Sequence, residues 1–109
     1  MRIWDISTEN LSREHLLGEH RELYAIWSIL INGKKGYSKH PETLRWSGKL
    51  KALYLRHEQQ LIEMEKRGFD HKSPLDARYA IGKNIQEDYV DPIEDQIKIL
   101  RKKGCKCNL

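Results

Sequence analysis

Apolar residues recur at helical spacing in three stretches of this chain, and this periodicity limits the fold more than any other feature. The stretches run from about Ser12 to Ile31, from Pro41 to Arg67 and from Asp91 to Lys103. A glycine follows each stretch closely, as is common at helix ends. No segment alternates polar and apolar residues as a strand would. The sequence therefore predicts an all-α fold, a compact single domain of three main helices, with a potential break in the second at Ser47-Gly48.

The length of 109 residues suits one domain, which we place at residues 1–104, followed by a short tail at 105–109. Hydrophobic residues make up 39% and charged residues 33%, and no apolar run is long enough to cross a membrane. The start of the chain lacks a secretory pattern, so we expect a cytoplasmic monomer, associated with the nucleoid when it acts on DNA. Cys105 and Cys107 are expected to lie in a reduced tail, with metal or redox chemistry as the alternative.

Positive charge is concentrated in two segments of the chain. Residues 33–57 hold seven basic side chains and one acidic one, and residues 98–106 hold five basic side chains and no acidic one. Residues 58–95 hold ten acidic and five basic side chains. Such segregation is expected where one face of a protein meets a polyanion. Ordinary solvated helix faces would give the same pattern, and the charges alone do not decide between the two.

The first predicted helix carries an unusual group of polar residues. His15, Glu19 and Glu22 share one stripe, and Arg21 lies about 100° around the helix from Glu22. Gly18 lowers helix stability, and we expect the N-terminal segment to pack closely against it. A solvated face with ion pairs is the alternative interpretation.

Several short words of the sequence are shared with a known family. They are Met1-Arg2-Ile3, His15-Leu16, Glu19, Arg21-Glu22-Leu23, Lys49-Leu50 and Lys66-Arg67-Gly68-Phe69. In these words the chain resembles the pyrimidine-dimer DNA glycosylases of the endonuclease V type, over residues 1 to about 100. The resemblance implies a three-helix domain that cuts the glycosidic bond at a cyclobutane pyrimidine dimer and then nicks the abasic site.

The resemblance also implies roles for individual residues. The nucleophile would be the α-amine of Met1, which we expect to be retained because Arg2 is long. Glu22 would be the essential carboxylate. The residues that would contact DNA or lie beside the site are Arg2, Arg21, His15, Lys102 and Lys103. No metal and no cofactor is expected, and the partner is damaged double-stranded DNA.

Two departures from the family pattern bear on the preferred lesion more than on the chemistry. Ala25 stands where the family has a DNA-contacting arginine, and the family's aromatic C-terminal tail is missing. Trp4, Trp46 and Tyr37 could supply a wedge or stacking face for distorted DNA. Trp27 and His57 are expected in the core.

An α-amine suits this chemistry because its ordinary pKa is about 7.7–8.0, well below that of a lysine. It can attack C1′ of the deoxyribose, expel the base and form an imine, after which β-elimination breaks the 3′ phosphate bond. Glu22 would stabilise the positive charge that develops on the sugar.

Two other function classes fit parts of the sequence. A non-enzymatic basic helical DNA-binding module would share the charged segments without using the amine. A metal-dependent bundle would draw on His15, Glu19, His20, His57 and Glu58, but their spacing does not match the inward pairs of di-iron bundles.

Overall fold

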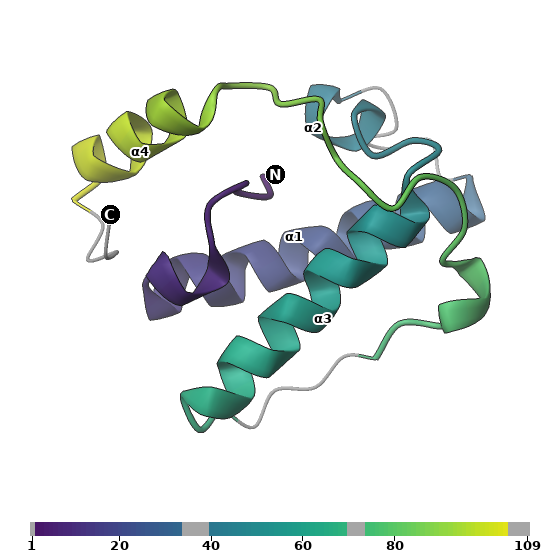
Figure 1. Cartoon of the computed structure of the whole chain (residues 1–109), viewed down its shortest axis with the longest axis horizontal. Coiled ribbons are helices and arrows are strands. Elements are labelled where there is room, and N and C mark those ends of the chain that lie inside the picture. Colours follow the sequence, from purple (N-terminus) through teal and green to yellow (C-terminus); the bar gives the residue numbers. More distant parts are fainter. Residues whose placement is uncertain (1, 34–39, 70–73, 105–109) are drawn as a thin grey trace.

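The computed structural model describes residues 2–33, 40–69 and 74–104. Within these three ranges it contains four α-helices and two short 3-10 helices, and no strand (Figure 1). The elements are η1 (Thr8–Asn10), α1 (Arg13–Asn32), α2 (Pro41–Leu44), α3 (Leu50–Lys66), η3 (Ala77–Tyr79) and α4 (Ile93–Lys102). The predicted all-α class with three main helices is confirmed. None of the described helices is long and apolar enough to span a bilayer.

The helix ends follow local chemistry that is visible in the sequence. The hydroxyl of Ser12 accepts the backbone N–H of His15 at the start of α1, as a helix N-cap should. Gly33 ends α1 at φ 62°, a left-handed conformation that glycine adopts without steric strain. The break predicted at Ser47-Gly48 separates α2 from α3.

The N-terminal backbone groups of α3 are satisfied by the long connection that precedes α4. The N–H groups of Lys51 and Ala52 donate to the carbonyls of Ile81 and Lys83, at 2.8 and 3.0 Å. This replaces a side-chain cap, which Lys49 does not provide. A side chain at position 82 would meet the carbonyl oxygen of Gly48 at 2.3 Å, so the connection can approach α3 only with glycine there.

α1 and α3 pack against each other, and α4 lies on the other side of the N-terminal segment, which we define as residues 2–7 (Figure 1). One core cluster joins this segment to α1 and α3 through Ile3, Leu23, Ile26, Trp27, Trp46, Ala52 and Leu53. A second cluster joins it to α1, α3 and α4 through Trp4, Ile6, Leu11, Leu16, Met64 and Leu100. The N-terminal segment is therefore part of the core, because Ile3 enters the first cluster and Trp4 and Ile6 enter the second.

Candidate active site

Three successive backbone N–H groups of the N-terminal segment are held by side chains from three different helices. Their acceptors are Glu42 of α2 for Ile3 at 3.1 Å, Glu19 of α1 for Trp4 at 2.6 Å, and Gln96 of α4 for Asp5 at 2.8 Å. These bonds satisfy the buried backbone much as a neighbouring strand would. Residues 3–5 are thereby held between α1, α2 and α4.

Glu19 lies beneath this segment and is almost completely buried, at 2% exposure. Its carboxylate accepts two bonds from the guanidinium of Arg56, at 2.9 and 3.0 Å, and one from the side-chain amide of Gln60. A buried carboxylate needs such partners, because its water of hydration has been removed. Glu19 thus holds the N-terminal segment from inside the protein, although it shares a helix face with His15 and Glu22.

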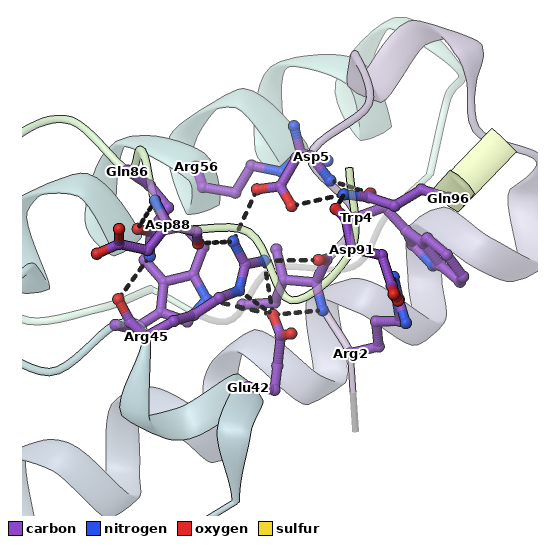
Figure 2. Close-up of polar contacts among 12 residues, drawn as sticks. Arg2, Trp4, Asp5, Glu42, Arg45, Arg56, Gln86, Asp88, Asp91 and Gln96 are labelled. Atoms are coloured by element: carbon purple, nitrogen blue, oxygen red, sulfur yellow. Dashed lines mark hydrogen bonds and ion pairs between the residues drawn. The ribbon is translucent and has the colours of Figure 1, made fainter. Parts of the chain in front are cut away.

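Arg45 is the second anchor of the segment, at 8% exposure. It donates to the carboxylates of Glu42 and Asp5 and to the backbone carbonyls of Ile3 and Asp88 (Figure 2). Burial alone would lower the pKa of Arg45, but the hydrogen bonds and charges of Glu42 and Asp5 outweigh it and raise the pKa. Arg45 therefore remains charged inside the protein.

Trp4 brings together three of the residues that the sequence assigned to the site. The Arg2 guanidinium lies 4.5 Å from the Trp4 ring centroid, the Lys103 ammonium 5.8 Å and the His15 ring 6.0 Å. Partial burial, and then the charge of Lys103, lower the pKa of His15. The end of α4 therefore contributes a cation beside the first turns of α1.

Arg2 also has a partner that the sequence did not reveal. Its guanidinium forms an ion pair with Asp91, at 2.8 Å, just before α4 (Figure 2). The Arg2 side chain is 26% exposed, so it is accessible from solvent while it is paired.

The remaining predicted site residues differ in their surroundings. Glu22 is half-buried, and no hydrogen bond or ion pair joins its carboxylate to another described residue. Arg21 and Lys102 are exposed. Met1 lies outside the described residues. A half-buried carboxylate with no partner in the described ranges is able to interact with a ligand.

Residues 1–77 match the family model described as pyrimidine dimer DNA glycosylase. The chain belongs to this family. No curated protein and no solved structure gives a significant match. Membership makes the protein an enzyme of the DNA glycosylase type with DNA as its substrate. The match covers the N-terminal segment and α1 to α3, and it ends before α4.

Three of the seven cations in the basic stretch, residues 33–57, are paired inside this glycosylase. Arg45, Lys49 and Arg56 are each paired internally, Lys49 with Asp88 at 2.5 Å. The three side chains neutralise the carboxylates of Asp5, Asp88 and Glu19, so their charges are not available to a polyanion. Lys51 is exposed. The other three cations of the stretch, Lys34, Lys35 and Lys39, lie outside the described residues.

The aromatic candidates of the glycosylase are also mostly internal. Trp4 and Trp46 are 5% and 3% exposed, so in this structure neither offers a stacking face to DNA. Trp27 and His57 lie in the core as predicted, and His57 stacks on His20 with ring centroids 5.0 Å apart. Tyr37, Cys105 and Cys107 lie outside the described residues.

The expected close packing at Gly18 is wrong. Apart from the adjoining part of α1 itself, no atom of the described residues would lie within 4 Å of a Cβ built at this position, and Trp4 of the N-terminal segment is bonded to Glu19 instead. Within the described ranges, no group of three or more metal-binding side chains is placed to hold an ion.

The sequence analysis did not identify four residues that hold the N-terminal segment, namely Glu42, Arg45, Asp91 and Gln96. One signal was present: Glu42 is the single acidic residue among seven basic ones in residues 33–57. An isolated acid in a basic stretch is a candidate for a buried ion pair. Nothing in the sequence pattern distinguishes Gln96 or Asp91 from other polar residues of α4 and its approach.

Proposed function

We propose that this protein is a pyrimidine-dimer DNA glycosylase with abasic-site lyase activity, and that the α-amine of Met1 is its nucleophile. The proposal depends on one observation above all. Trp4 is bonded through its backbone to Glu19, three residues before Glu22 on the same side of α1. Trp4 is thus held beside the helix that carries the proposed catalytic carboxylate.

The amine would attack C1′ of the damaged nucleotide, and the base would leave with the electron pair of the glycosidic bond. Opening of the sugar ring gives an imine between the amine and C1′. Removal of a C2′ proton then allows β-elimination, in which the 3′ phosphate leaves. The ordinary pKa of an α-amine, about 7.7–8.0, leaves a substantial neutral and nucleophilic fraction near physiological pH.

Glu22 would stabilise the positive charge that forms on the sugar as the base leaves. Its lack of a partner among the described residues supports this role, because a carboxylate already in an ion pair would be less available. Its partial burial strengthens its interaction with a nearby positive charge compared with full solvent exposure. The same group could accept the C2′ proton.

Arg21, Lys102 and Lys103 would contact the phosphates around the lesion, with His15 beside the site. Arg21 and Lys102 are exposed, and Lys103 lies against Trp4. Arg2 would exchange its ion pair with Asp91 for a phosphate oxygen. Phosphate contacts of this kind fix the position of the DNA.

Borohydride trapping tests the proposal, because borohydride reduces an imine to a stable cross-link. The protein is mixed with abasic, irradiated and intact duplexes, and the cross-linked peptide is identified by mass spectrometry. We expect a cross-link at Met1 with abasic DNA and nicks in abasic and irradiated DNA. Acetylation of the N-terminus should prevent the cross-link.

Glu22→Gln should lose strand nicking and keep DNA binding, whereas the exposed Glu65→Gln on α3 serves as the matched control and should nick normally. A cross-link that persists after acetylation would point to a lysine instead. Binding of abasic DNA with neither a cross-link nor a nick would favour a non-enzymatic DNA-binding module.

A further inference from the structure

We infer that Glu42 and Arg45 are positioning residues that determine where the N-terminal nucleophile lies. This inference rests on the function proposed above. It concerns two buried side chains that cannot themselves contact DNA, at 3% and 8% exposure.

The two residues hold both polar groups of one residue near the chain end. The N–H of Ile3 donates to Oε1 of Glu42 at 3.1 Å, and the carbonyl of Ile3 accepts from Nη2 of Arg45 at 2.9 Å. The N–H and carbonyl of one residue in an extended chain point to the same side, so a single ion pair can bind both. The Glu42–Arg45 pair, 2.7 Å apart, thus binds Ile3 in the way that a residue of a neighbouring antiparallel strand would.

The pair is itself held in place from several directions. Oε1 of Glu42 also accepts from the indole of Trp46 at 3.3 Å, and Arg45 donates to Asp5 and to the carbonyl of Asp88, both at 3.0 Å. A guanidinium with several fixed acceptors has little freedom to move. The position of Ile3 is therefore set by the core and not by the chain end.

Covalent geometry carries this constraint to the amine. Two residues span at most ~7 Å, so the nitrogen of Met1 stays within that distance of the Ile3 nitrogen. A displacement of reacting groups by ~1 Å can slow a reaction by about 100-fold. Loss of the pair should therefore slow imine formation without weakening DNA binding.

The test compares Glu42→Gln and Arg45→Lys with the matched control Arg67→Lys. Arg67 holds the residues that follow the N-terminal segment, farther along the chain from the amine, by donating to the carbonyls of Thr8, Glu9 and Leu11. The rate of borohydride trapping is measured at saturating abasic duplex, together with the Kd for that duplex and the hydrogen exchange of the Ile3 amide. All variants are assayed at a temperature at which tryptophan fluorescence shows them folded.

We expect trapping to slow by roughly 10- to 100-fold in the first two variants and by less than about 3-fold in the control. The Kd should stay within about 2-fold, and the Ile3 amide should exchange faster only in the first two. Normal trapping in folded Glu42→Gln, or equal slowing in Arg67→Lys, would overturn the inference.

A variant with intact anchors keeps the inference testable if the buried substitutions prevent folding. One glutamine inserted between Met1 and Arg2 moves the amine by about 3.5 Å along the chain and leaves Glu42 and Arg45 unchanged. We expect trapping to fall at least 10-fold; an undiminished rate would overturn the inference. If the unaltered protein gives no cross-link at all, the proposed function fails, and the inference fails with it.

Discussion

Removing the charge of Glu19 should destabilise the protein strongly, and removing its partner's charge as well should restore part of the loss. The carboxylate of Glu19 is fully buried, with its side chain 0% exposed, and the Arg56 side chain is 11% exposed. Glu19→Gln leaves the guanidinium without its counterion and turns an amide NH₂ group towards existing donors. Arg56→Met leaves the carboxylate charged in the interior, with only neutral donors.

The structure allows the size of the effect to be estimated. Breaking a buried ion pair by changing one partner costs about 3–5 kcal/mol, whereas replacing both partners is often close to neutral. Each single substitution should therefore lower the free energy of unfolding by about 3 kcal/mol or more. The double substitution should cost at least ~2 kcal/mol less than the sum of the two.

Urea denaturation followed by tryptophan fluorescence measures these energies, since all three tryptophans are buried. With a slope of about 2 kcal/mol per molar urea, a loss of 3 kcal/mol lowers the midpoint by about 1.5 M. The exposed ion pair of Asp76 and Arg78 is the control, and Asp76→Asn should leave the midpoint unchanged.

Additive losses in the Glu19 and Arg56 cycle would refute this reasoning, because they would show that the two charges do not depend on each other. A single-variant midpoint equal to that of the unaltered protein would do the same.

Three further predictions concern DNA binding and pH. Asp91→Asn should release Arg2 from its ion pair and tighten binding of duplex DNA several-fold. It should also steepen the slope of log affinity against log salt concentration by up to about one unit, as measured by fluorescence anisotropy at several salt concentrations. An unchanged slope would show that Arg2 does not reach phosphate. Arg21→Ala should weaken binding and flatten the salt dependence by a similar amount, and equal slopes would remove Arg21 from the contacts. NMR titration should give His15 a pKa below its ordinary value, and the pKa should rise again in Lys103→Gln. The folded state then takes up a proton less readily than the unfolded state, so His15 makes the stability fall as the pH drops through 6.5. A pKa at or above 6.5 would contradict the placement of α4.

The sequence predicted the local features of this fold well. The glycines after the three stretches, and the predicted starts at Pro41 and Asp91, identified the helices to within a few residues. These signals act within one or two turns of the backbone, so they can be read without knowledge of the tertiary structure. The core positions of Trp27 and His57 followed from helical spacing in the same way.

The partner of each charged side chain could not be predicted from the sequence in the same way. Arg45 and Arg56 are basic residues of a basic stretch, yet each compensates a carboxylate that is distant in sequence, 37 residues away for Glu19 and 40 for Asp5. Periodicity places a residue on a face of its helix. It does not say which other segment covers that face.

The sequence by itself determined the helices, the family and the residues proposed for chemistry, because those depend on local spacing and on short words near the N-terminus. The tertiary structure alone decided that residues 3–5 lie between α1, α2 and α4, with Glu19, Glu42 and Gln96 bound to their successive N–H groups. The physical reason is that buried backbone groups must find partners wherever packing places them. Those partners come from helices that become neighbours only when the chain has folded.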